Sequence, residues 1–196
     1  MRKFKYAVIG LYNYGKFYKD TKHNVGYKFS KFFIEKYKNE LKLIKNFNYK
    51  IFKMNISKFV LYIILTKNFI NLSWISLLNF KKIYNIHTKN IIIIRDDVYL
   101  PLGLAKIKFG CGHGGHNGVK NIINKLKSKN FFQIKIGIGK NGKKILNIKD
   151  FVMTKFNLEE NKILNKVIIN SINCLEIFFK KNFNFASCYL NSKKIS

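Results

Sequence analysis

Acidic side chains are rare in this sequence, and two of them stand together where a catalytic group would be expected. Between Glu40 and Asp150 the only carboxylates are the adjacent Asp96 and Asp97. They follow the apolar run 91–94 (IIII), which is typical of a buried strand, and in open α/β sheets catalytic groups gather at the carboxyl ends of strands. Aspartate is also common in turns. We expect at least one of the pair to belong to a functional site.

His23 is the residue best suited to move a proton near neutral pH. It lies beside Asn24 in a polar loop that follows the first predicted strand. Neutral imidazole, with a pKa near ~6.5, can act as a general base, although a loop histidine is often only a surface residue. The amides of Asn13, Asn71 and Asn117 both donate and accept hydrogen bonds, which suits holding a peptide carbonyl or an oxyanion. These residue types allow a hydrolase with a His–Asp couple without establishing one.

The glycine-rich loop 110–118 (GCGHGGHNG) suggests two further kinds of site. Its glycines match the dinucleotide pattern G-x-G-x-x-G, but no acidic residue follows about 20 positions later to bind a ribose, which disfavours a nucleotide-dependent oxidoreductase. His113 and His116 could join Asp96 and Asp97 around zinc or manganese. Histidines that cap the loop are the simpler interpretation, because no third strong ligand follows at a defined spacing. We expect no metal here.

Apolar periodicity predicts the elements that would position these residues. Strands are predicted over 4–10, 49–54, 59–65, 91–94, 104–109 and 133–138. Helices are predicted over 25–41, 69–83, 118–127 and a final amphipathic segment, 164–179. The wholly apolar strand indicates helices on both faces of the sheet, and no linker or repeat interrupts the alternation. We predict an α/β fold: a single domain, 1–196, with a twisted, mostly parallel (mixed) sheet covered by helices on both faces.

Composition excludes several classes of protein. With 47% hydrophobic and 16% aromatic residues, the 196-residue chain is too apolar to be intrinsically disordered. Its longest apolar runs, 59–65 and 91–94, are far below the ~20 residues that span a bilayer. We expect no secretory signal and, from three cysteines without a CxxC pair, reduced thiols. The expected location is cytoplasmic.

The charge balance favours a polyanionic partner. The chain has 38 basic and 9 acidic residues, a net charge of +29, and such a field attracts nucleic acid or an anionic membrane surface. Lysine, asparagine, isoleucine and phenylalanine dominate, as drift in an AT-rich genome would produce, so part of the charge is attributed to drift. Lysines interleaved with apolar residues indicate a folded basic surface rather than a basic tail.

Six motifs, in order along nearly the whole chain, resemble those of bacterial-type peptidyl-tRNA hydrolases. They are 8–15 (VIGLYNYG) with 23–26 (HNVG), 68–73 (NFINLS), 96–103 (DDVYLPLG), 110–118 (GCGHGGHNG), 136–139 (IGIG) and 150–156 (DFVMTKF). The resemblance implies hydrolysis of the ester that joins a peptide to the 3′ end of tRNA, without metal or cofactor.

Matching positions carry the family's catalytic roles to this sequence. His23 would be the general base that activates water, and Asp96 would orient and polarise its imidazole. Asn13 and Asn71 would position the peptide end and stabilise developing charge, while Asn117 would help to hold peptide or water. The electrostatics agree, because a carboxylate stabilises the imidazolium that forms when the base takes a proton.

The resemblance also implies how tRNA is bound. Tyr18 would line the site near the terminal nucleotide, and the basic positions Lys106, Lys108 and Lys135 would hold tRNA phosphate. The expected partner is the acceptor end of peptidyl-tRNA, with no membrane, and the expected state is a monomer. The alternative is a noncatalytic RNA-binding protein or splicing cofactor on the same fold, because chloroplast splicing factors resemble this family; the intact site residues favour the enzyme.

Four positions depart from the family's pattern. Tyr14 stands where proline is usual, Trp74 where glycine is usual, and Val98 where an acid is usual. Lys135 stands where arginine is common, and lysine offers a point charge without the planar fork that binds phosphate with two hydrogen bonds. We expect weaker phosphate binding at that position.

Overall fold

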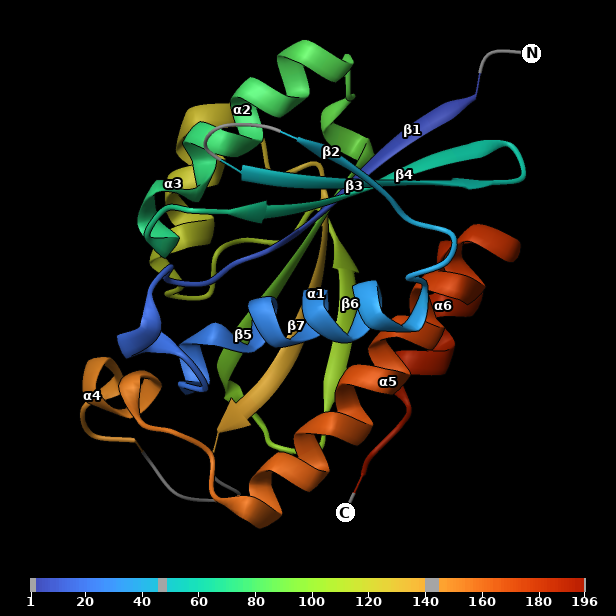
Figure 1. The fold of residues 1–196 in the computed structure, drawn as a ribbon. Helices are drawn as coiled ribbons and strands as arrows, with labels where there is room; N and C mark the ends of the chain where they lie inside the picture. Colours follow the sequence, from blue (N-terminus) through green and yellow to red (C-terminus); the bar gives the residue numbers. More distant parts are fainter. Residues whose placement is uncertain (1–2, 46–48, 140–144, 196) are drawn as a thin grey trace.

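The computed structural model describes residues 3–45, 49–139 and 145–195, and their strands form a mixed seven-stranded sheet (Figure 1). The strands are β1 (Phe4–Gly10), β2 (Lys42–Lys45), β3 (Tyr49–Ile56), β4 (Phe59–Thr66), β5 (Ile91–Pro101), β6 (Ala105–Phe109) and β7 (Phe132–Gly139). Their order is β2-β3-β4-β1-β5-β7-β6. The four central strands are parallel, and antiparallel pairs complete both edges.

The described residues also form six α-helices and four short 3-10 helices. The α-helices are α1 (Val25–Lys36), α2 (Ser73–Tyr84), α3 (Asn117–Leu126), α4 (Ile148–Met153), α5 (Leu158–Lys180) and α6 (Phe183–Asn191). The 3-10 helices are η1 (Lys16–Tyr18), η2 (Lys22–Asn24), η3 (Ile70–Leu72) and η4 (Thr88–Asn90). In the described part of the chain, no helix has both the length and the hydropathy needed to cross a membrane.

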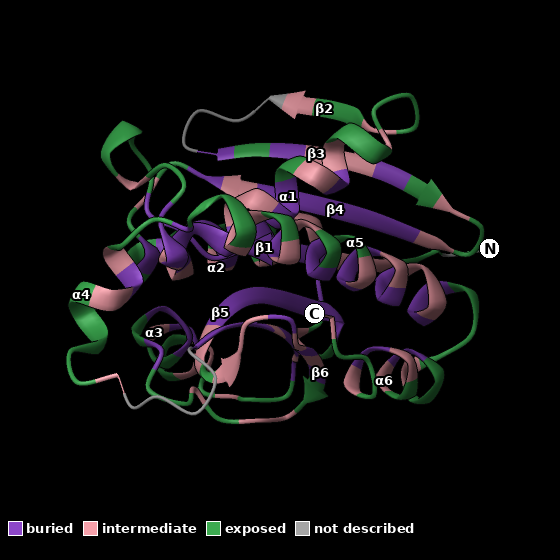
Figure 2. Cartoon of the chain, turned by 90° about the horizontal axis from the view of Figure 1, so that it is seen from below, coloured by how far each residue is buried: buried purple, intermediate pink, exposed green. Residues whose placement is uncertain are grey.

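Helices cover both faces of the sheet, as predicted. One core lies under α1, α5 and α6, and the other lies under α2 and α3. The run Ile91, Ile92, Ile93 and Ile94 supplies both cores alternately, because successive side chains of a strand point to opposite faces. All four isoleucines are completely buried, and the central strands form the buried layer in Figure 2.

Several elements differ from the sequence-based prediction. Asp96 and Asp97 do not follow the strand but lie within it, because β5 continues its parallel pairing with β7 through both residues. The predicted final helix, 164–179, lies within α5, but a further helix that was not predicted, α6, follows it, and the Asn182 side chain caps α6 by accepting a hydrogen bond from Phe185 N–H. The first helix ends at Lys36 rather than continuing to residue 41.

Candidate active site

His23 and Asp96 are in direct contact. His23 lies on η2, in the connection that follows β1, and its Nδ1 is 3.0 Å and 3.1 Å from the two carboxylate oxygens of Asp96 on β5. β1 and β5 are parallel neighbours, so the chain leaving β1 passes over the carboxyl-terminal half of β5. Asp96 is 2% exposed. The fold therefore brings together the two residues to which the sequence assigned the chemistry, 73 positions apart.

His116 is a third member of this cluster. Its Nε2 lies 3.2 Å from Asp96 Oδ1, and its Nδ1 accepts a hydrogen bond from Val119 N–H at the start of α3. Because Nδ1 accepts, the proton is on Nε2, which donates to the carboxylate. The capping interpretation of this loop histidine is correct, and its contact with Asp96 is additional. Nothing in the spacing of the sequence signals that contact.

The charges of the cluster follow from burial and from these contacts. Burial raises the pKa of Asp96, but the two imidazoles outweigh it, so the pKa falls below its usual value. Burial lowers the pKa of His23, yet the charge and hydrogen bond of Asp96 prevail and raise it above the ordinary value. For the more deeply buried His116 desolvation prevails, and the pKa is lowered. Asp96 is thus a carboxylate held between a neutral donor and a strengthened base.

Asp97 has a different environment from its neighbour. Its Oδ2 lies 3.4 Å from Arg95 Nη2 and 3.9 Å from Lys135 Nζ. Arg95 is buried, donating from Nε to the Gln133 side chain and from Nη1 to the Asp96 carbonyl. Asp97 therefore neutralises two cations, and Asp96 is the member of the pair that contacts His23.

Asn13 is held so that its amide group remains a donor. The Asn13 side-chain oxygen accepts from Ile70 N–H at 2.9 Å, while its backbone N–H and carbonyl exchange hydrogen bonds with the Asn24 side chain at 2.9 Å and 3.0 Å. The Asn13 Nδ2 has no partner among the described residues. Asn24, next to His23, is a positioning residue that the sequence reasoning did not assign. Its side chain holds the Asn13 end of the connection between β1 and α1 against the end that carries His23.

The other predicted binding residues lie on three separate elements near the segment that carries Asn13. Asn71 is exposed on η3, and Asn117 is exposed as the first residue of α3; these two elements pack against each other. Tyr18, on η1, is half-buried with its ring 5.9 Å from that of Phe69, which directly precedes η3. Asn71, Asn117 and Tyr18 thus lie around the connection between β1 and α1 that carries Asn13.

Two of the departures from the family's pattern have structural consequences. Tyr14 donates its backbone N–H to the Asn68 carbonyl at 3.2 Å, a hydrogen bond that proline could not make. Trp74 packs against the core under α2 and α3, with Lys125 Nζ 4.6 Å from its ring centroid. The first departure adds a link between the Asn13 connection and the segment that carries Asn71. The second fills space at the start of α2.

A cavity of about 300 Å³ adjoins the cluster. His23, Asp96, His116 and Asn117 line it, together with the glycine-rich loop, residues 98 and 99 of β5, and α4. Asn13, Asn71 and Tyr18 are not part of this lining. The short helix α4, which periodicity did not predict, packs against η2 and forms part of the cavity wall.

A backbone contact sets the position of His23. A Cβ on Gly10 would lie 2.1 Å from the Gly26 carbonyl oxygen, and a Cβ on Gly26 would lie 2.4 Å from Leu11 N. Both are far inside contact distance. The start of α1 therefore touches the end of β1 backbone to backbone, and His23, three residues before Gly26, is held against the sheet.

The metal site suggested as an alternative from the sequence contains the wrong residues. Of His113, His116, Asp96 and Asp97, only His116 and Asp96 meet, and the third member of their group is His23. Ligand atoms of these three residues lie within 4.8 Å of one another. Two imidazoles and a carboxylate are a donor set that zinc accepts.

The predicted phosphate-binding lysines lie on the two outer strands beyond β5. Lys106 on β6 is directly opposite Lys135 on β7, and Lys108 is opposite Gln133. Paired residues share a face of the sheet, as do residues two apart on a strand. The three lysines therefore share one face, as predicted.

Comparisons with known proteins agree on one family. The family model for peptidyl-tRNA hydrolase matches residues 7–196. The chain is 34% identical over 189 residues to a peptidyl-tRNA hydrolase of Haemophilus influenzae, covering 96% of this chain and 97% of that one. It is 34% identical over 173 residues to that of Clostridium botulinum, covering 88% and 89%.

A solved structure gives the same result. The crystal structure of peptidyl-tRNA hydrolase from Acinetobacter baumannii superposes with a TM-score of 0.87 at 28% identity, covering 99% of this chain and 97% of that one. The sequence motifs, the fold and the relatives coincide over nearly the full length. The chain belongs to the peptidyl-tRNA hydrolase family.

Proposed function

We propose that this enzyme hydrolyses the ester of peptidyl-tRNA with a water molecule activated by His23, which Asp96 orients. The observation that carries the assignment is the contact of His23 Nδ1 with both oxygens of Asp96. A proton on Nδ1 leaves the lone pair on Nε2, which has no partner among the described residues. Nε2 takes a proton from water as the hydroxide attacks the ester carbonyl, and returns it to the departing 3′ oxygen of the tRNA. Asp96 stabilises the intervening imidazolium.

The amides would hold the acyl part of the substrate. Asn13 offers its free Nδ2, because Ile70 N–H already occupies its oxygen. Asn71 and Asn117, both exposed, would bind the peptide and steady the oxyanion that forms on the ester carbonyl. Tyr18 would line the site near the terminal nucleotide.

The expected partner and cellular setting follow from this activity. The enzyme would act on the acceptor end of peptidyl-tRNA as a cytoplasmic monomer, with residues 1–196 forming one domain and with no cofactor. The test of the function is release of free peptide from purified peptidyl-tRNA by the purified protein. Tight tRNA binding without release would support the noncatalytic RNA-binding alternative.

Prolonged treatment with a tight chelator is expected to leave the rate of peptide release unchanged. The geometry gives the reason: a metal ion at the cluster would take His23 Nδ1 and Asp96, removing the hydrogen bond that orients the base. Release is measured before and after chelation, and again after zinc or manganese is added back. A fall in activity on chelation that added metal reverses would contradict the proposed mechanism.

Removing Lys106, Lys108 or Lys135 is expected to weaken the salt dependence of tRNA binding. Removal of one phosphate-binding lysine should reduce the log–log slope of affinity against salt by roughly 0.7 on single-stranded RNA and about 0.9 on a duplex-like stem. The measurement is tRNA affinity across a salt series for each lysine-to-alanine variant.

The control for this series is the Lys81/Lys82 double-alanine variant on α2. It removes more charge at a position to which no phosphate contact is assigned, so its slope should change less. Equal changes of the salt slope in all four variants would mean that affinity comes from the electrostatic field of the whole protein, and the three-lysine site would be abandoned.

A further inference from the structure

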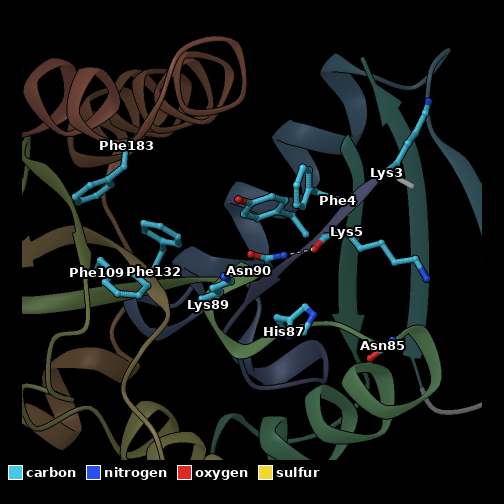
Figure 3. Close-up of a pocket in the computed structure, with 11 residues that line it drawn as sticks. Lys3, Phe4, Lys5, Asn85, His87, Lys89, Asn90, Phe109, Phe132 and Phe183 are labelled. Carbon is cyan, nitrogen blue, oxygen red and sulfur yellow. Dashed lines mark hydrogen bonds between the residues drawn. The ribbon is translucent and has the colours of Figure 1, made fainter. Parts of the chain in front are cut away.

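A second, larger cavity opens at the other end of the parallel strands, away from the His23–Asp96 cluster. Its volume is about 690 Å³, and it lies where the parallel strands begin: at the start of β1, before β5 and at the start of β7 (Figure 3). The His23–Asp96 cluster lies toward the other end of the same strands. β1 is 7 residues long, or about 20 Å at roughly 3.3 Å per residue. The cavity is therefore separate from the active site.

Aromatic rings form the walls of this second cavity. Phe109, Phe132 and Phe183 lie on one side, and Phe4 lies on the other (Figure 3). The Phe109 and Phe132 ring centroids are 4.7 Å apart, and those of Phe132 and Phe183 are 5.3 Å apart. Phe4 is 61% exposed and Phe109 is 43% exposed. Exposed aromatic side chains gathered at one concave place are typical of a binding surface.

The charged residues of the lining are all basic. Lys3, Lys5 and Lys89 contribute to it, and no aspartate or glutamate does. Lys5 Nζ donates to the Tyr84 carbonyl, whereas Lys3 and Lys89 make no ion pair with any described residue. Two exposed ammonium groups thus flank the rings. The occupant must combine negative charge with flat apolar surface.

We infer that this cavity is a second RNA-binding site, which takes unpaired nucleotides of a single-stranded segment. Bases would stack on Phe109 and Phe4, and the phosphates between them would contact Lys89 and Lys3. Stacking on aromatic rings combined with a basic groove is how proteins bind single strands without reading sequence. The inference does not depend on ester hydrolysis.

The buried polar side chain of the lining favours an RNA chain over a free nucleotide. Asn90 Nδ2 donates to the Lys5 carbonyl, the dashed line in Figure 3, so it is not free to read a base edge. Recognition therefore rests on stacking and charge, which are weak for one nucleotide and accumulate along a strand.

The test compares two double variants for binding to a fluorescently labelled single-stranded RNA of about 10 nucleotides, a length typical of such sites. The first, Phe109→Ala with Lys89→Ala, removes one ring and one cation from the cavity. The matched control, Phe185→Ala with Lys181→Ala, removes the same groups outside it: Phe185 is 54% exposed, and Lys181 Nζ lies 4.7 Å from its ring centroid. Anisotropy gives the affinity, and thermal unfolding verifies that both variants fold.

The cavity variant should bind at least about fivefold more weakly than the unmodified protein, the low end of the effect of removing one stacked base, and the control should change little. Phe109→Trp, which keeps a stacking surface, should retain the affinity. Equal losses in both double variants would overturn the inference. So would tight binding of AMP with no gain from longer RNA, or loss of binding to phosphatidylserine vesicles while RNA affinity stays unchanged.

Discussion

Replacing His23 by alanine will reduce peptide release to near background while leaving tRNA affinity nearly intact. The variant loses the nitrogen that accepts the proton of water, and general-base catalysis typically contributes about 10²–10⁴-fold. His23 is a single half-buried side chain in the cavity, and none of the three lysines to which phosphate binding is assigned lines that cavity. Single-turnover release and tRNA affinity, measured on the same preparation, separate catalysis from binding.

Undiminished turnover in the His23→Ala variant would remove the residue from the mechanism. A His23→Gln variant serves as a second test, because its side chain keeps polarity and length but cannot act as a base at neutral pH. Loss of activity in both variants with normal thermal unfolding would assign the defect to proton transfer.

Changing Asp96 to asparagine will lower the rate by about 10–10⁴-fold, by analogy with other His–Asp couples. The amide can no longer stabilise imidazolium, and it can present an N–H to His23 Nδ1, which would favour the wrong tautomer. The pH profile will shift as well. The base works only when neutral, so activity rises with pH through the pKa of His23; the carboxylate raises that pKa, and its removal moves the rise to lower pH.

Asp97→Asn is the matched control for this experiment. Asp97 is paired with Arg95 and Lys135 rather than with His23, so its removal should affect stability while the rise of kcat/KM with pH stays in place. A fully active Asp96→Asn enzyme, with the pH shift appearing in Asp97→Asn instead, would transfer the role to Asp97.

The fold was predictable where local periodicity is strong. The run 91–94 required a strand covered on both faces, and four isoleucines completely buried between two cores confirm it. The edge strand β2 and the helix α4 were not predicted, because 4 and 6 residues are too few to show a period. The extension of β5 through Asp96 depends on pairing with β7, which no local pattern encodes.

Residues of the candidate site that belong to sequence motifs could be predicted. Contacts that form only when distant segments fold together could not. His23, Asp96 and the three asparagines follow from ordered motifs. The bond between His116 and Asp96 joins residues 20 positions apart, and the links from Asn24 to Asn13 and from Asn13 to Ile70 exist only once the connections are folded against each other. The sequence analysis placed His116 beside Asp96 only as part of a metal alternative that it did not favour, and a direct hydrogen bond between the two residues was not considered.

The backbone contact between Gly10 and Gly26 limits how closely the start of α1, and with it His23, can approach the sheet. A helix that rests on a sheet through side chains shifts whenever mutation changes their volume, since protein cores are closely packed. Here α1 meets β1 with no side chain between them at that point, so its approach is limited by the main chain itself. Changes of side-chain volume elsewhere in the core therefore cannot bring α1 closer to β1 at this point.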